Sequence, residues 1–211
     1  TAYEITYGDW SSDVCSSDLF TFIRYEISGR EYIDQGRSSI FVSNHTSFLD
    51  LPGLCLTLPG EFRPLAKKEL LKLPVFGWIA SAATVIVDRS SHESRRKSMD
   101  KLRELLNRGV SVLIFPEGTQ NRTDKPLQPF KDGAFRMAIE TGCPVVPVVI
   151  EGAGQLMPPG KFFIMRGVVR IKAGKPIEIH PESGITSESL RNEVFGIMEN
   201  MISNLRSEAK S

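Results

Sequence analysis

Short apolar runs alternate with amphipathic stretches along the chain from about Phe20 onwards. The runs have strand length and are bounded by glycine, proline or polar residues; they cover residues 20–27, 39–42, 84–87, 110–115, 145–150 and 168–173. Helical spacing of apolar side chains is clearest at 90–109, at 133–142 and in a last helix from about Thr186, whose expected inner stripe is Leu190, Val194, Ile197, Met201 and Leu205. This alternation predicts a single three-layer α/β domain with a mostly parallel central sheet flanked by helices.

The first 19 residues do not follow this pattern. Residues 11–19 nearly repeat a Ser-Ser-Asp-aliphatic unit and show no amphipathic period. We therefore interpret 1–19 as a disordered or artefactual leader and 20–211 as the folded domain. The chain begins with threonine rather than methionine, which leaves room for a missing N-terminal anchor.

The composition is that of an ordinary folded protein and excludes several classes. With 41% hydrophobic residues and a net charge of +1, no global field favours nucleic acid. The widely spaced Cys15, Cys55 and Cys143 indicate neither a disulfide framework nor a zinc site, and they fit a reducing compartment. We expect no metal and no cofactor, and no apolar run is long enough to cross a bilayer.

A histidine and a carboxylate follow the apolar run at 39–42. Asp50 lies five positions after His45, a spacing that would turn the two side chains apart on a regular helix. The pair can meet only if His45 lies on a loop and Asp50 in or near the first turn of the next helix. The carboxylate would then hold one ring nitrogen and leave the other as a base. From spacing alone, the alternative is an exposed loop histidine and a helix-start aspartate. For Ser47, beside the histidine, we expect a helix cap rather than a nucleophile.

Polar groups also follow two other predicted strands. The run at 110–115 leads into Pro116-Glu117-Gly118-Thr119, and the run at 84–87 is followed by Arg89. A plain strand-to-turn transition explains the proline and the glycine but not the carboxylate. Because the carboxyl ends of parallel strands share one edge, we expect a base, a cation suited to phosphate and a polar cradle to lie together.

The segment Asn-His-Thr-Ser-Phe-Leu-Asp at 44–50 resembles the His-four-residues-Asp motif of the glycerolipid acyltransferases. Further blocks similar to this family follow in family order between about Phe20 and Ile179, at 67–70, 74–78, 88–89, 115–119, 129–135 and 145–148. Several motifs at the proper spacing are far more specific than one. The resemblance implies the glycerolipid acyltransferase fold.

The resemblance also implies a reaction: acyl transfer from acyl-CoA or acyl-carrier protein to a hydroxyl, without a covalent acyl-enzyme. By analogy, His45 removes the hydroxyl proton, and Asp50 orients the ring and steadies the imidazolium. The implied groups for the phosphorylated acceptor are Arg89, Glu117, Gly118 and Thr119, with Lys67 and Lys131 as weaker candidates that are otherwise surface lysines.

One position departs from the family pattern. Members commonly carry arginine directly after Glu-Gly-Thr, whereas this chain has Gln120, Asn121 and then Arg122. Either Arg122 supplies the charge, or the acceptor is held less through its phosphate.

We therefore expect an O-acyltransferase that acylates the sn-2 hydroxyl of 1-acyl-sn-glycerol 3-phosphate to give phosphatidate. The alternatives are the same chemistry on glycerol 3-phosphate, another lysophospholipid or a lyso-ornithine lipid, and a lipid-binding domain without turnover. The expected partners are the two substrates and a membrane surface, with acyl-carrier protein as a further candidate and no nucleic acid.

Two apolar segments beside cations are candidates for a face that dips into a membrane. The first is the block around 75–79, next to Lys67 and Lys68, for which a core helix is the alternative; the second is the run from Lys161 to Arg166. These segments predict monotopic or peripheral attachment, which we place on the cytoplasmic face.

Overall fold

The computed structural model describes residues 23–58, 60–67, 85–87, 92–161, 163–180, 182 and 184–209. Its strands are β1 (Ile23–Ser28), β2 (Ile40–Ser43), β3 (Phe62–Lys67), β4 (Val85–Val87), β5 (Ser111–Ile114), β6 (Val145–Glu151) and β7 (Gly167–Ala173). Its helices are the 3-10 turn η1 (Arg30–Tyr32), α1 (Asp50–Thr57), α3 (His92–Asn107), α4 (Gly133–Thr141), α5 (Ala153–Leu156) and α6 (Ser187–Glu208).

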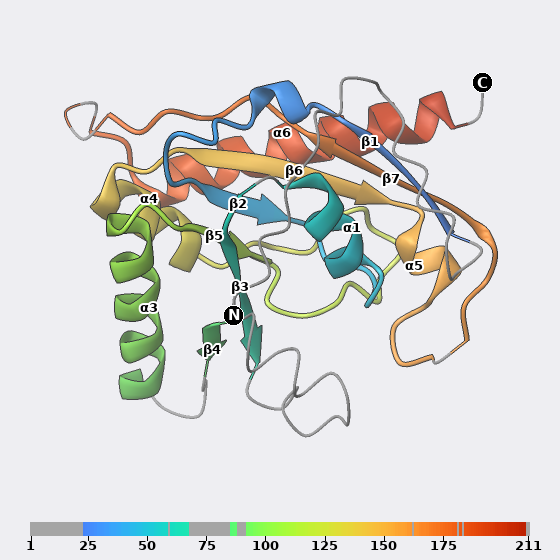
Figure 1. Ribbon diagram of the computed structural model, residues 1–211, viewed down its shortest axis with the longest axis horizontal. Coiled ribbons are helices and arrows are strands. Elements are labelled where there is room, and N and C mark those ends of the chain that lie inside the picture. The colour runs from blue at the N-terminus through green and yellow to red at the C-terminus, as the bar shows by residue number, and fades with distance from the viewer. Residues whose placement is uncertain are drawn as a thin grey trace, which may run out of the picture.

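The described strands form a seven-stranded sheet in the order β1-β7-β6-β2-β5-β3-β4 (Figure 1). Neighbouring strands are parallel at every step except between β6 and β7, which pair antiparallel. The five strands from β6 to β4 therefore end at one edge of the sheet. The prediction of a mostly parallel sheet is confirmed.

Two apolar cores cover the two faces of the sheet. Because successive side chains of a strand point to opposite faces, Phe41 of β2 enters one core and its neighbours Ile40 and Val42 enter the other. The core around Phe41 includes side chains of α1, α5, β1 and β7. The core on the opposite face includes side chains of α3, α4 and α6. The chain thus has the three layers that the pattern predicts, with the sheet in the middle.

For the last helix, α6, the sequence predicted the starting residue correctly but only part of the buried face. The side chain of Thr186 caps α6 by accepting from the Ser189 N–H at 3.1 Å, so the helix starts where expected. Its buried residues, however, are Leu190, Val194, Met198, Ile202 and Leu205. The expected Ile197 and Met201 are only partly buried, with Met201 packed against the core, so the fully buried stripe lies one residue further along at these two positions.

Several expectations fall on residues outside the described ranges: the leader at 1–19, the apolar block at 75–79 and Arg89. Lys67 is the last residue of β3. None of the described helices combines the length and the apolar character needed to cross a membrane.

Candidate active site

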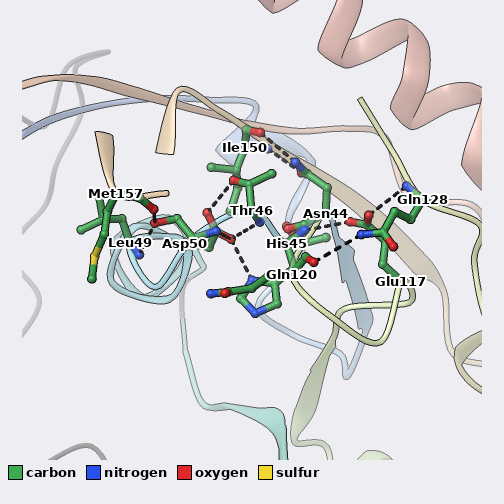
Figure 2. Close-up of polar contacts among 12 residues, drawn as sticks. Asn44, His45, Thr46, Leu49, Asp50, Glu117, Gln120, Gln128, Ile150 and Met157 are labelled. Carbon is green, nitrogen blue, oxygen red and sulfur yellow. Dashed lines mark hydrogen bonds and ion pairs between the residues drawn. The ribbon is translucent and has the colours of Figure 1, made fainter. Parts of the chain in front are cut away.

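His45 and Asp50 meet at the end of β2, as their spacing requires (Figure 2). His45 lies on the loop after the strand, and Asp50 is the first residue of α1. Nδ1 of His45 lies 2.8 Å from Oδ2 of Asp50. The contact occupies Nδ1, so Nε2 is the ring nitrogen left for a substrate. The imidazole is 24% exposed, whereas the aspartate side chain is fully buried.

The Asp50 carboxylate has partners beyond the histidine. Its Oδ2 also accepts from the backbone N–H of Thr46 at 2.6 Å and of Ser47 at 2.8 Å, and its Oδ1 accepts from Thr46 Oγ1 at 3.3 Å. A buried carboxylate is tolerated when such donors replace its lost water. Because two N–H groups already point at Oδ2, the oxygen acts as an acceptor, and we assign the Nδ1 proton to His45.

Ser47 does not cap α1, contrary to expectation. The helix has Leu49 at its N-cap position, with no side-chain cap hydrogen bond. Instead, Ser47 Oγ accepts from the Leu49 N–H at 3.2 Å and donates to the Met157 carbonyl at 2.8 Å. The serine hydroxyl therefore links this loop to the segment after α5.

The backbone of His45 is held on both sides by the loop that follows β5. Its N–H donates to Glu117 Oε1 at 2.9 Å, and its carbonyl accepts from the Asn121 N–H at 2.6 Å. The second carboxylate oxygen, Oε2, accepts from the Gln128 N–H at 2.9 Å. Burial raises the pKa of Glu117, while these two amides pull it in the opposite direction. Glu117 therefore joins three loop segments through main-chain bonds.

Two further residues fix the position of His45 from other directions. Asn44 donates to the Ile150 carbonyl and accepts from the Ile150 N–H, both at 2.8 Å, which ties the end of β2 to β6. The ring of Phe115 stacks on the imidazole with 4.2 Å between centroids and 22° between planes. His45 is thus fixed in three ways: Phe115 stacks on its ring, the loop after β5 binds its main chain, and β6 binds the preceding residue.

Four further expected site residues, Gly118, Thr119, Arg122 and Lys131, belong to the loop that follows β5. Gly118 adopts a φ of 78° and donates its N–H to the Phe115 carbonyl at 3.0 Å, which closes the turn after β5. Thr119 and Lys131 are exposed. Arg122 is also exposed, and its guanidinium comes within 3.9 Å of where a Cβ on Gly160 would stand.

Gln120 occupies the position of the departure from the family pattern. It precedes Asn121, whose N–H binds the carbonyl of His45, so its side chain leaves the backbone close to the histidine (Figure 2). Its Nε2 is one of two buried side-chain nitrogens without a hydrogen-bond partner among the described residues; the other is Nε of Arg30. A buried donor of this kind is costly unless a ligand satisfies it.

Sequence reasoning found the histidine, the aspartate and the glutamate but not all of their supports. Asn121 and Gln128 act through backbone N–H groups, which every residue but proline carries, so no side-chain signal marks them. Phe115 and Asn44 stand within the quoted motifs but had no assigned role. No group of three or more His, Cys, Asp or Glu side chains in the described part of the chain is placed to hold a metal ion.

Comparison with known proteins identifies the family. The sequence matches the Acyltransferase family over residues 24–151, more than half of the chain. This range contains both the His45–Asp50 loop and the loop after β5. The chain belongs to the acyltransferase family.

Named relatives agree with this assignment. A chloroplastic 1-acyl-sn-glycerol-3-phosphate acyltransferase from Brassica napus is 35% identical over 191 residues, which are 89% of this chain and 54% of the relative. The human beta form of the enzyme is 34% identical over 82% of this chain and 62% of its own length. The match to a chloroplastic 1-acyl-sn-glycerol-3-phosphate acyltransferase from Arabidopsis thaliana covers 46% of that relative. This chain therefore spans about half the length of these two plant enzymes.

The fold has a counterpart among solved structures. The 1-acyl-sn-glycerophosphate acyltransferase of Thermotoga maritima superposes with a TM-score of 0.73 and 31% sequence identity. The match covers 89% of this chain and 73% of that one. The predicted acyltransferase fold is therefore confirmed.

Proposed function

We propose that this chain transfers a fatty acyl group from a thioester to the sn-2 hydroxyl of 1-acyl-sn-glycerol 3-phosphate and so forms phosphatidate. The observation that carries the proposal is the His45–Asp50 pair at 2.8 Å, with the imidazole partly exposed and the carboxylate fully buried. Binding alone requires no oriented base. The relatives named above, which are called 1-acyl-sn-glycerol-3-phosphate acyltransferases, support the choice of acceptor.

In the proposed reaction His45 acts as the general base. Nε2 takes the proton of the acceptor hydroxyl as its oxygen attacks the thioester carbonyl carbon. The new C–O bond forms, the C–S bond breaks, and the imidazolium returns its proton to the departing thiolate. Asp50 holds Nδ1–H and stabilises the imidazolium, while Thr46 and Ser47 hold the carboxylate. General acid–base catalysis of this kind contributes roughly 10²–10⁴-fold to a rate.

Glu117 is better explained as a positioning residue than as a contact for the acceptor. Both of its carboxylate oxygens accept main-chain N–H groups, one of them from His45 itself. Its side chain also lies in the interior, where only 4% of the residue is exposed. It therefore contributes to the reaction by holding the backbone of the base.

The acceptor groups that we propose are polar and cationic residues around this edge of the sheet. Gly118 and Thr119 form the turn beside His45, and Gln120 offers a buried N–H without a described partner. We assign the acceptor phosphate to Arg89, with these further cations near it: Lys67, Arg122 and Lys131. Gln120, where the family commonly has arginine, supplies a neutral hydrogen-bond donor instead of a cation. Acceptors without a phosphate group are therefore worth testing as well.

We propose acyl-CoA or acyl-carrier protein as the donor and a membrane surface as the place of the reaction, because the acceptor and the product are lipids. Cys55 and Cys143 are free thiols, which fits attachment on the reducing, cytoplasmic side.

A thiol-release assay tests the proposed function. The protein is incubated with acyl-CoA or acyl-acyl-carrier protein and, in parallel, with lysophosphatidate, glycerol 3-phosphate, other lysophospholipids and a lyso-ornithine lipid. We expect free thiol to appear only when an acceptor is present, fastest with lysophosphatidate, and without a burst when the acceptor is withheld.

Preference for another acceptor would move the proposal to that lipid, with the same chemistry. No acceptor-dependent thiol release with any donor would contradict the reaction and favour a lipid-binding domain.

A further inference from the structure

An apolar run is exposed on the segment that connects α5 to β7. Phe163, Ile164 and Met165 are 52%, 47% and 46% exposed. Among the described residues, Leu56 at 37% is the other large hydrophobic residue with comparable exposure. Three consecutive large apolar side chains in water form a patch that a partner would cover, whereas single exposed ones are ordinary.

The base of this segment is fixed to the protein core. Leu156, the last residue of α5, is buried, and a Cβ on Gly167 would meet its side chain at 2.5 Å. The Met165 N–H donates to the Leu156 carbonyl at 2.9 Å, which closes the loop at its base. The loop therefore presents its apolar run from an anchored position.

The same segment is joined to the catalytic loop. Ser47, three residues before Asp50, donates to the carbonyl of Met157 at 2.8 Å. In Figure 1 the segment follows α5 and lies on the side of the molecule towards which the arrows of β2 and β6 point. The apolar run and the partly exposed ring of His45 thus belong to one edge of the sheet.

Cations surround the apolar run. Lys161 precedes it, Arg166 follows it, and the guanidinium of Arg122 approaches Gly160 at the start of the segment. All three residues are exposed, and none of them forms an ion pair with another described residue. Apolar side chains flanked by exposed cations complement a bilayer with anionic headgroups, where the apolar groups enter the interface and the cations remain at the phosphates.

We propose that Lys161 and residues 163–166 belong to a membrane-binding loop that inserts Phe163, Ile164 and Met165 into the interface of an anionic bilayer. The choice of a bilayer as the occupant rests on the proposed function, which places both lipid substrate and lipid product at this edge. Insertion here turns the His45 edge of the sheet towards the lipid layer, so a lysolipid reaches the base without leaving the membrane surface.

Vesicle sedimentation of the full chain, without substrates, tests the loop. The vesicles are phosphatidylcholine with or without phosphatidylglycerol. Replacing the three apolar residues together (Phe163→Ser, Ile164→Ser, Met165→Ser) should lower partitioning to anionic vesicles by at least about 10-fold. Leu56→Ser, which removes an exposed apolar side chain from α1, is the matched control and should sediment like the parent.

The charge contribution is measured separately. Lys161→Gln with Arg166→Gln should lower binding to anionic vesicles by roughly 5-fold for each cation removed, with the effect fading as salt is added. The control pair is Lys101→Gln with Arg136→Gln, which removes the same charge from α3 and α4 at the other end of the molecule and should have little effect (Figure 1).

Unchanged sedimentation of a folded triple variant would overturn the proposal, as would an equal loss in the control pair. The proposal would also be overturned if the parent protein sedimented with neither kind of vesicle. The same holds if the parent were a dimer and the triple variant a monomer, because the apolar run would then be a protein interface. Because sedimentation needs no turnover, a protein that binds vesicles but fails the thiol-release assay would contradict the proposed reaction and leave the membrane loop supported.

Discussion

Glu117 shows how a single buried carboxylate connects the motifs of this chain. Its two oxygens bind the N–H groups of His45 and Gln128, residues on different loops. Burial raises the pKa of the carboxyl above its ordinary value near 4.5. The side chain thus fixes the backbone of the histidine at a cost in stability, because a charge is kept away from water.

The raised pKa of Glu117 predicts a pH effect on stability. Since the folded state holds the proton to higher pH than the unfolded state, the contribution of this group is full below the unfolded pKa. It is lost as pH rises through the folded pKa. Glu117→Gln removes the titration and keeps an oxygen for the His45 N–H. The unfolding free energy of the parent, measured in urea relative to this variant, should therefore fall as pH rises from below 4.5 towards neutrality.

Because the other titrating groups are common to both proteins, they largely cancel in this difference. A difference that stays constant with pH, or that grows in favour of the parent as pH rises, would show that Glu117 is not a strained buried carboxylate.

For single residues, the sequence predicts which side chains belong to the site better than it predicts their hydrogen-bond partners. The spacing of His45 and Asp50 allows contact only from a loop and a first helical turn, and the structure has that arrangement. The role of Ser47 was missed because its hydroxyl donates to the carbonyl of Met157, 110 residues further along the chain. Contacts to backbone groups, such as those of Asn121 and Ile150, leave no mark in the residue types.

Among the elements, α1 matters most because it carries Asp50. A Cβ on Gly53 would lie 2.5 Å from Cδ1 of Ile171 and 2.7 Å from Cε1 of Tyr25. The helix therefore packs against β1 and β7 at a distance that only glycine permits. The Tyr25 hydroxyl donates to the Leu49 carbonyl at 3.2 Å, and burial together with nearby Asp50 raises the pKa of Tyr25 to about 12, so this donor keeps its proton.

Substitution of Gly53 tests this close packing. Gly53→Ala should push α1 away from the sheet, lower the unfolding free energy by about 1–3 kcal/mol and reduce turnover as Asp50 shifts. Urea unfolding and the thiol-release assay measure the two effects.

Gly196 is the matched control, because it lies within α6 and, apart from its chain neighbours and the helix's own backbone, no heavy atom of the described residues stands within 4 Å of where its Cβ would be. Gly196→Ala should raise the unfolding free energy by about 0.5–1 kcal/mol through helix propensity. Equal effects of the two substitutions would contradict the account of α1.

Elements with a long apolar run or a full helical period were predictable, and short ones were not. The turn η1 and the helix α5 have three and four residues, too few to show a period. The stripe of α6 was wrong at Ile197 and Met201 because the apolar residues around them allow two neighbouring stripes. The packing against the sheet selects the one through Met198 and Ile202.

At the scale of the whole molecule, the order of the strands in the sheet decides which residues meet at the site. His45 and Glu117 are 72 residues apart, yet they meet because β2 and β5 pair in parallel and end at one edge. Asn44 reaches Ile150 because β6 is the neighbour of β2 on its other side. Local patterns predict that the sheet is parallel, but strand order follows from packing over the whole chain. The reversal at β7, which pairs antiparallel with β6, had no local signal.

The decisive measurement is the rate of acceptor-dependent thiol release by His45→Ala compared with the parent. We expect a loss of about 10²–10⁴-fold, because the variant removes the base while Glu117 and Asn121 still bind its main chain. His180→Ala, which removes an exposed histidine far along the chain, should keep the parental rate. A His45→Ala protein that is folded and turns over within about 10-fold of the parent would contradict the assignment of His45 as the general base.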